Sequence, residues 1–229
     1  MDSHGKRYVV NRNKKTQADS AGKQLLENAY ELETPDDNRT YYDELARSYD
    51  EDFANGLQYR LPTHVYDVFS ALANPEDSPI LDVGCGTGLL GGLLSASECV
   101  VDGADISPAM LRVCKEKGVY RQLFEVDLTE SLANISNGYG AVLSSGTFTH
   151  GHLGTEPFVA LLDVANPNAL FVITINKVHF EQMGFSATVD GLIESNRIKS
   201  LKVSTVNIYA NSDHAHSADE GLVVSFRKA

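Results

Sequence analysis

The chain has no tryptophan, and only three cysteines and three methionines among its 229 residues. The cysteines, Cys85, Cys99 and Cys114, are too few and too scattered for a disulfide framework or a zinc knuckle. They predict free thiols in a reducing compartment, which favours a cytoplasmic protein. Long apolar runs are also absent, because the most apolar stretches, such as residues 169–175, have the length of a strand. A disulfide-rich secreted fold is therefore excluded, and no membrane partner is expected.

Positive charge is scarce, since 19 Lys and Arg stand against 31 Asp and Glu and the formal net charge is −12. An acidic surface repels phosphate backbones, so nucleic acid is not an expected partner. Residues 1–15 are basic instead and lack apolar periodicity. We interpret residues 1–39 as a polar N-terminal extension, with a targeting or docking arm as the alternative, and residues 40–229 as the folded domain.

Short β-rich apolar runs alternate with helix-like stretches from about residue 79 onward. This alternation predicts βαβ units and a mainly parallel sheet, which is the Rossmann-like, doubly wound α/β fold class. The predicted parallel strands are residues 80–83, 100–104, 122–126, 141–144 and 169–175. Two further runs, residues 202–209 and 222–226, predict an antiparallel pair. Helices are predicted ahead of the sheet at residues 40–49 and 61–73.

The most informative pattern is a strand that runs into glycines, Ile-Leu-Asp-Val-Gly-Cys-Gly-Thr-Gly from Ile80 to Gly88. Without a Cβ, glycine can adopt positive φ and let backbone N–H groups and a helix N-terminus approach a ligand. Ligands of open α/β sheets bind at this carboxyl end of the strands. Gly86, Gly88 and Gly91 also satisfy the dinucleotide pattern, so the loop alone leaves a nicotinamide-dependent oxidoreductase open.

Acidic residues at the ends of three predicted strands narrow the choice of ligand. Asp82 precedes the glycines, where a carboxylate would oppose a pyrophosphate but suit an ammonium group. Asp105 closes the second strand, where it can accept hydrogen bonds from both ribose hydroxyls while Ile106 packs on adenine. Asp127 is assigned to the adenine amino group, with a helix N-cap as the alternative. S-adenosylmethionine, a cationic nucleoside, fits this set, whereas Asp102 is predicted to face solvent.

Two stretches, residues 80–88 and Val101–Leu111, resemble the first and second motifs of the class I S-adenosylmethionine-dependent methyltransferases. Within that superfamily the chain looks most like the Williams-Beuren-region methyltransferase-like proteins. The matching segments are Tyr42-Asp-Glu-Leu-Ala-Arg-Ser-Tyr49-Asp50, Lys117-Gly-Val-Tyr120 and Ser145-Gly-Thr-Phe-Thr-His-Gly-His152. The resemblance covers the chain from about Tyr41 to the C-terminus.

This resemblance implies a seven-stranded sheet with an antiparallel last strand, in three α/β/α layers. It also implies a lid helix in which Tyr42 and Tyr49 contact the methionine end of the cofactor, and S-adenosylhomocysteine as the product. Simple packing of the two rings on the sheet is the alternative. The predicted cofactor-binding residues are Tyr42, Tyr49, Asp82, Gly84, Cys85, Gly86, Gly88, Asp105, Ile106, Met110, Asp127, Leu128, Ser144 and Ser145.

Methyl transfer mainly requires alignment of the acceptor with the methyl carbon and sulfur, and a base only if the acceptor carries a proton. His150 and His152 follow the fourth strand and are the candidate catalytic bases, with surface histidines as the alternative. His214 and His216 are interpreted as loop residues, because nothing beside them completes a metal site. Residues 177–185 are predicted either to roof an acceptor pocket or to form a core helix.

The acceptor is predicted to be a small molecule. The fourth strand does not end in the Asp/Asn-Pro-Pro-aromatic tetrad that resembling families use to hold the amino group of a base or amide. The acidic surface argues against nucleic acid in the same way. A non-catalytic sensor or scaffold that retains the S-adenosylmethionine pocket remains the alternative from a different functional class.

Overall fold

A computed structural model of the protein describes residues 22–32, 34–149, 153–210 and 213–229. Residues 22–30 are helical. The further α-helices are α2 (Pro35–Leu45), α3 (Leu61–Leu72), α4 (Leu89–Leu94), α5 (Pro108–Lys117), α6 (Thr155–Val164), α7 (Lys177–Gln182) and α8 (Phe185–Glu194). The strands are β1 (Ile80–Val83), β2 (Val101–Asp105), β3 (Leu123–Glu125), β4 (Tyr139–Phe148), β5 (Ala165–Asn176), β6 (Ile198–Asn207) and β7 (Glu220–Lys228). None of these described helices has the length and apolar character that a bilayer span needs.

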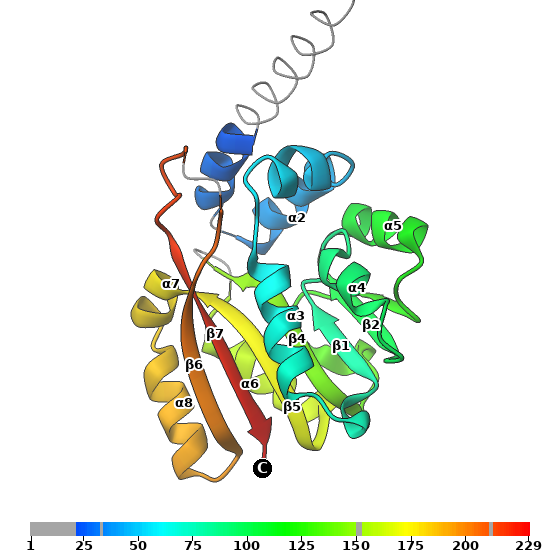
Figure 1. The fold of residues 1–229 in the computed structure, drawn as a ribbon, viewed down its shortest axis with the longest axis vertical. Helices are drawn as coiled ribbons and strands as arrows, with labels where there is room; N and C mark the ends of the chain where they lie inside the picture. The colour runs from blue at the N-terminus through cyan, green and yellow to red at the C-terminus, as the bar shows by residue number, and fades with distance from the viewer. Residues whose placement is uncertain (1–21, 33, 150–152, 211–212) are drawn as a thin grey trace, which may run out of the picture.

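The strands form one seven-stranded sheet in the order β3-β2-β1-β4-β5-β7-β6 (Figure 1). Strands β1 to β5 run parallel, and β7 lies between β5 and β6 and is antiparallel to both. The predicted fold class and the antiparallel C-terminal pair are thus confirmed. Since the first strand pairs with both β2 and β4, the strand order reverses at β1, and ligands of such sheets bind beyond the strand ends at this point.

Alternate residues of the central strands pack on opposite faces of the sheet, as the two-residue period of a strand requires. On one face Leu81 and Phe171 belong to the same apolar cluster as Phe158 of α6 and Phe185 of α8. On the other face, neighbouring strand residues such as Ile80 join a cluster with α3 and α4. Helices on both faces bury the central strands, whereas the edge strands β3 and β6 stay partly exposed, so the three-layer arrangement follows from the near-continuous apolar runs of the central strands.

The first predicted helix is displaced from its expected position. The structure has α2 at Pro35–Leu45 and then a π-helix at Tyr49–Asn55, rather than one helix over residues 40–49. The earlier start has a local cause, because Thr34 and Asp37 form a reciprocal capping box ahead of Pro35. Leu26 is buried in a cluster with Leu45 and Phe53. The packed structure therefore includes residues ahead of residue 40, where the sequence pattern indicated an extension.

Asp102 does not face solvent, and that prediction is wrong. Its side chain is fully buried in β2 and accepts hydrogen bonds from Arg121 Nε and Nη2 at 3.0 and 2.6 Å. The Tyr139 hydroxyl donates a further bond at 2.9 Å and the Gln122 backbone N–H another at 3.1 Å. A buried carboxylate is tolerated here because these donors replace its water shell, and Arg121 comes from the loop before β3, beyond the reach of a local sequence pattern.

Candidate cofactor and acceptor site

The glycine-rich loop after β1 has the backbone that the sequence predicts. Gly84, Gly86 and Gly88 have φ values of 66°, 53° and 86°, in the left-handed region that favours glycine. A Cβ on Gly84 would lie 1.9 Å from Thr147 Oγ1, so that position excludes any side chain. A Cβ on Gly86 would meet nothing within 4 Å, and this residue lines the main cavity. The backbone of the loop is therefore directly accessible to a ligand in the cavity.

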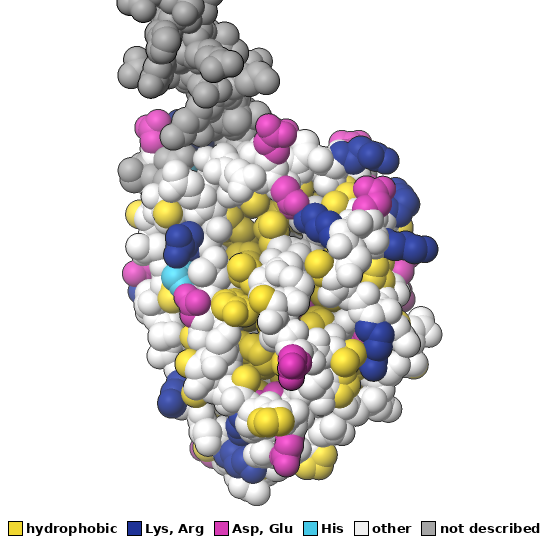
Figure 2. All heavy atoms as spheres, turned by 45° about the vertical axis from the view of Figure 1, so that its right-hand side comes forward, with side chains coloured by type: hydrophobic (Ala, Val, Ile, Leu, Met, Phe, Trp, Pro, Cys, Tyr) yellow, Lys and Arg dark blue, Asp and Glu magenta, His cyan; other side chains and the backbone are white. Residues whose placement is uncertain are grey.

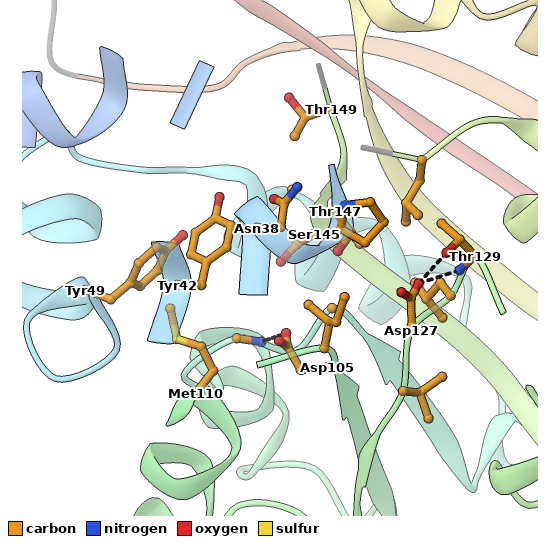
Figure 3. Close-up of a pocket in the computed structure, with 18 of the residues that line it drawn as sticks. Asn38, Tyr42, Tyr49, Asp105, Met110, Asp127, Thr129, Ser145, Thr147 and Thr149 are labelled. Carbon is orange, nitrogen blue, oxygen red and sulfur yellow. Dashed lines mark hydrogen bonds between the residues drawn. The ribbon is translucent and has the colours of Figure 1, made fainter. Parts of the chain in front are cut away.

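The cavity lies at the carboxyl ends of the parallel strands, below the N-terminal helices (Figure 3). Ten of the predicted cofactor-binding residues line it: Tyr42, Tyr49, Gly84, Gly86, Asp105, Ile106, Met110, Asp127, Leu128 and Ser145. They come from α2, the π-helix, the glycine loop, β2, α5, β4 and the segment after β3. The topology therefore gathers residues that are far apart in the sequence around one space.

Asp105 is held in a fixed orientation at the tip of β2. Its Oδ2 accepts a hydrogen bond from the Gly86 N–H at 2.8 Å, and its Oδ1 accepts one from the Ser107 N–H at 2.9 Å. Burial raises the pKa of this carboxyl group, and the two backbone donors partly oppose that rise. A carboxylate oxygen can accept more than one hydrogen bond, so both oxygens retain acceptor capacity toward the cavity.

Asp127 makes cap-type hydrogen bonds and also lines the cavity, and its assignment to the adenine amino group stays a prediction. Its Oδ1 accepts hydrogen bonds from the backbone N–H of Thr129 at 2.8 Å and from the Thr129 hydroxyl at 2.6 Å, as in a turn or helix cap. Its side chain also lines the cavity beside Leu128 (Figure 3). The local bonds fix the rotamer, which leaves the carboxylate positioned for a polar group in the cavity.

Four predicted residues do not line the cavity, namely Asp82, Cys85, Gly88 and Ser144. Ser144 donates a hydrogen bond to the Val83 carbonyl oxygen at 2.9 Å and is fully buried. The Cys85 thiol packs against Gly103 and lies 3.9 Å from the Cys114 sulfur. Gly88 caps α4 against Cys114 and Tyr120. These three residues therefore pack on the side of the glycine loop that faces away from the cavity, where they support its backbone conformation.

Asp82 lies one layer beneath the loop. Its Oδ2 accepts a hydrogen bond from the Tyr120 hydroxyl at 2.7 Å, and its Oδ1 is buried without a partner among the described residues. Burial raises the pKa of this carboxyl group to about 7, the Tyr120 bond lowers it, and the nearby Asp105 raises it. A buried carboxylate oxygen with no donor is costly, and a nearby cation would lower that cost.

The N-terminal helices are fastened to the sheet domain by two aspartates of the Tyr42–Asp50 segment. Asp43 Oδ1 accepts hydrogen bonds from the Ser107 hydroxyl at 2.6 Å and from the Ala109 N–H at 3.0 Å, at the start of α5. Asp50 accepts bonds from the Thr87 hydroxyl in the glycine loop and from the Lys117 ammonium. These bonds hold Tyr42 and Tyr49 over the cavity, with their ring centroids 6.2 Å apart.

We expect Asp43→Ala to weaken S-adenosylmethionine binding about tenfold, since losing a charge-assisted cap contact costs on the order of 1–2 kcal/mol. The folded domain should survive, because the main apolar clusters do not involve Asp43. Calorimetric titration measures the affinity, and thermal unfolding measures the stability. Glu44→Ala, at an exposed neighbouring position, is the matched control and should leave affinity unchanged. Equal affinities for both variants would show that the Asp43 contact does not support the site.

Several cavity residues were not predicted from the sequence. They are Pro35, Asn38, Tyr59, Val126, Thr129, Gly146, Thr147, Thr149 and Leu153. Thr147 belongs to the resembling Ser145–His152 segment and could have been assigned by its place after Ser145. Tyr59 carries no such signal, because it reaches the cavity through a bridge to Tyr209 near the other end of the chain.

The two candidate bases, His150 and His152, lie outside the described residues, so their role stays a prediction. His179 and Phe185, from the segment predicted to roof a pocket or join the core, are both buried. His179 Nε2 lies 2.7 Å from the Leu153 carbonyl oxygen, and Phe185 packs against Phe158. These two residues therefore belong to the core. Within the described ranges no group of His, Cys, Asp and Glu could hold a metal ion.

Three observations test whether this site fits a cationic nucleoside. Gly86 leaves open space where a side chain would stand, Asp105 presents a fixed carboxylate, and Asp82 buries an oxygen that no donor of the described ranges reaches. The first permits close backbone approach, the second suits a ribose diol, and the third suits positive charge nearby. The residues present fit the group.

Comparison with known protein families gives one match. Residues 80–167 match the family model described as a methyltransferase domain. This range begins with β1 and the glycine loop and ends within β5. A search of curated proteins finds none that matches the chain.

Solved structures share the fold at low sequence identity. A TehB-like S-adenosylmethionine-dependent methyltransferase from Corynebacterium glutamicum has a TM-score of 0.52 and 18% identity, with 85% of this chain and 98% of that chain covered. Magnesium protoporphyrin IX methyltransferase from Synechocystis, solved with bound S-adenosylhomocysteine, has a TM-score of 0.58 and 16% identity, with 84% and 95% covered. An S-adenosylmethionine-dependent methyltransferase from Clostridium acetobutylicum has a TM-score of 0.58 and 14% identity, with 82% and 99% covered. These likenesses extend over nearly the whole of each relative.

Proposed function

We propose that this protein is a class I S-adenosylmethionine-dependent methyltransferase, and that it acts on a small-molecule acceptor by direct displacement at the methyl carbon. The observation that carries the proposal is a cavity at the strand ends that shares a wall with a second, aromatic-lined cavity. The residues shared by both are Tyr42, Tyr49, Tyr59, Gly146 and Thr149. One space is suited to the cofactor and the adjoining one to an acceptor.

When bound, S-adenosylmethionine supplies a methyl carbon that its sulfonium already activates. We assign the ribose hydroxyls to Asp105, the adenine to Ile106 and Leu128, and the adenine amino group to Asp127. The remaining candidates around the methionine end are Tyr42, Tyr49, Met110, Gly84, Gly86 and Ser145. Asp82 contributes negative charge from beneath the loop, while Cys85, Gly88 and Ser144 maintain the loop's shape. The protein's main task is then to align two molecules and exclude water.

The tyrosine hydroxyls around this junction are suited to positioning rather than to proton removal. Burial raises the pKa of Tyr42, Tyr49 and Tyr59 above the ordinary phenol value, so each stays neutral at pH 7. A general base for a protonated acceptor must therefore come from elsewhere, and His150 and His152 remain the candidates that the sequence supplies.

Charge supports a small acceptor over nucleic acid. Lys and Arg on the face drawn in Figure 2 stand in small groups at its margins, with Asp and Glu among them, and apolar side chains run down its middle. The net charge of −12 acts against a polyanion. We further propose a cytoplasmic location and kinship with the Williams-Beuren-region methyltransferase-like proteins, which rest on the free thiols and on the segments Tyr42–Asp50 and Ser145–His152.

Methyl transfer from isotopically labelled S-adenosylmethionine tests the proposal. The purified protein is incubated separately with a small-metabolite extract, with RNA and with unfolded protein, and label is followed by mass spectrometry. Label should enter the small-molecule fraction, and an Asp105→Ala sample should transfer none. Label in RNA or protein alone would refute the small-molecule acceptor. Tight cofactor binding with no transfer to any fraction would instead favour a sensor or scaffold.

A further inference from the structure

We infer that the acceptor is a small amine, which binds in the aromatic cavity beside the cofactor site and enters past Asp219. This inference rests on the proposed function and names the substrate class of the same site. Two cavities beyond the cofactor pocket carry it. We call the first the inner chamber, lined by Tyr30, Phe53, Tyr59, Phe148, Asn176 and Tyr209 among others. We call the second the outer groove, lined by Tyr30, Asn176, Lys177, Glu181, His216 and Asp219 among others.

The three cavities lie next to one another in series, because each shares lining residues with the next. The inner chamber shares five residues with the cofactor pocket, including Tyr49 and Tyr59, and it shares Tyr30 and Asn176 with the outer groove. The Tyr59 hydroxyl lies over Gly146 at the boundary, where a Cβ on Gly146 would come within 1.9 Å of it. Among the described residues, the inner chamber thus lies between the outer groove and the cofactor pocket, and we place the acceptor's path through it.

The inner chamber is small. Its volume is about 50 Å³, which is room for roughly three or four water-sized groups. It admits the reactive end of an acceptor, while the rest of the molecule lies in the outer groove. This volume excludes a bulky group of a macromolecule and favours a small head group at the end of a short chain.

The aromatic rings of the chamber favour a cation. Tyr49 stacks on Phe53 with ring centroids 4.9 Å apart, Phe53 meets Tyr59 edge-on at 6.0 Å, and Tyr59 lies 5.9 Å from Tyr209. Aromatic faces attract ammonium groups most strongly where water is excluded. An uncharged apolar head group would also pack here, so the charges at the entrance decide between the two.

Those charges are mostly negative. Asp219 accepts a hydrogen bond from the Tyr30 hydroxyl at 2.6 Å and lies 3.1 Å from His216 Nδ1, and His216 in turn stacks on the Tyr30 ring. Lys177 supplies the sole Lys or Arg among the described lining residues of all three cavities, and its Nζ lies 2.6 Å from Glu220 Oε2. An anionic acceptor such as a carboxylate or phosphate ester would thus face carboxylates without a free cation, whereas an amine is attracted.

The transfer itself balances for a primary amine. The acceptor enters as its ammonium form, attracted by Asp219, and must lose one proton to water before its nitrogen can react. The nitrogen lone pair then forms the new N–C bond while the C–S bond of the sulfonium breaks. The products are a methylated ammonium ion and the neutral thioether S-adenosylhomocysteine.

Binding to the S-adenosylhomocysteine-saturated protein tests the inference. Linear primary amines of two to six carbons are compared with the alcohols and carboxylates of equal length by ligand-observed NMR. Amines should bind at least tenfold more tightly than the alcohols, and the carboxylates should not bind. With S-adenosylmethionine in place of the product, the amine that binds best should release S-adenosylhomocysteine. Equal binding of amines and alcohols, or binding of the carboxylates, would overturn the inference.

Asp219→Asn separates a charge effect from a packing effect. It should reduce the preference for amine over alcohol about tenfold and leave the affinity for S-adenosylhomocysteine unchanged, with thermal unfolding as the check on folding. Asp190→Asn, at an exposed site on α8, is the matched control. Tyr30→Phe gives a second test, because it removes the hydroxyl that bonds Asp219 but keeps the ring. An unchanged preference in Asp219→Asn would contradict the role of this carboxylate, whereas absent S-adenosylhomocysteine binding in the parent protein would refute the proposed function itself.

Discussion

Asp105→Ala should lower the affinity for S-adenosylmethionine at least 100-fold, the larger of the two main effects expected here. A hydrogen bond to a charged group contributes about 1.5–3 kcal/mol, and a carboxylate can hold both ribose hydroxyls, so losing the pair corresponds to two decades or more. The alanine also removes the acceptor for the Gly86 N–H and so loosens the glycine loop. Calorimetric titration of both proteins provides the comparison.

The matched control for this prediction is Asp105→Asn. Asparagine keeps one oxygen acceptor and the size of the side chain but replaces the second oxygen by a donor. It should therefore bind with an affinity between those of the parent protein and the alanine variant. S-adenosylhomocysteine, which lacks the sulfonium charge but keeps the ribose, should lose the same factor in Asp105→Ala. A loss for S-adenosylmethionine alone would mean that Asp105 acts through charge and does not hold the ribose.

Asp82→Asn should stabilise the ligand-free protein, relative to the parent, by about 3 kcal/mol more at pH 8 than at pH 4.5. Burial raises the pKa of Asp82 from 3.8 to about 7. Between pH 3.8 and about pH 7, the folded state therefore holds a proton that the unfolded chain has lost. Stability from this group is therefore present at low pH and falls as pH rises toward 7. Asparagine cannot ionise, and its oxygen can still accept the Tyr120 bond.

Urea unfolding at pH 4.5, 6, 7 and 8 measures this difference. Asp67→Asn, exposed on α3, is the control and should follow the parent protein at every pH. At pH 8 the same Asp82 variant should bind S-adenosylmethionine about tenfold more weakly than the parent protein, because it lacks the buried negative charge that favours the cation. At pH 6 the two proteins should bind about equally, because Asp82 of the parent is then mostly protonated. Parallel stability curves for the parent protein and Asp82→Asn would show that Asp82 is not protonated in the folded state.

The strands and the glycine loop could be predicted from the sequence because local rules determine them. Buried parallel strands appear as continuous apolar runs, and the loop needs glycine at Gly84 for contact with Thr147. The carboxylates at strand ends could be placed for the same reason, since the ends of parallel strands meet at one rim. Asp105 and Asp127 accordingly line the cavity.

Residues whose positions depend on distant partners could not be predicted. Asp102 is buried because Arg121 and Tyr139 reach it from two other segments. Tyr59 enters the site through its bridge to Tyr209. The roles of Asp43 and Asp50 also depend on packing of the N-terminal helices against α5 and the glycine loop, although the family resemblance of the Tyr42–Asp50 segment implied that it covers the site.

Calorimetric titration of the purified protein tests most directly whether this pocket binds S-adenosylmethionine for methyl transfer. S-adenosylmethionine and S-adenosylhomocysteine should both bind in the micromolar range with one site per chain, and NAD should give no heat. Both responses should disappear in Asp105→Ala. Absence of binding by both ligands, or a response to NAD in their place, would contradict the account.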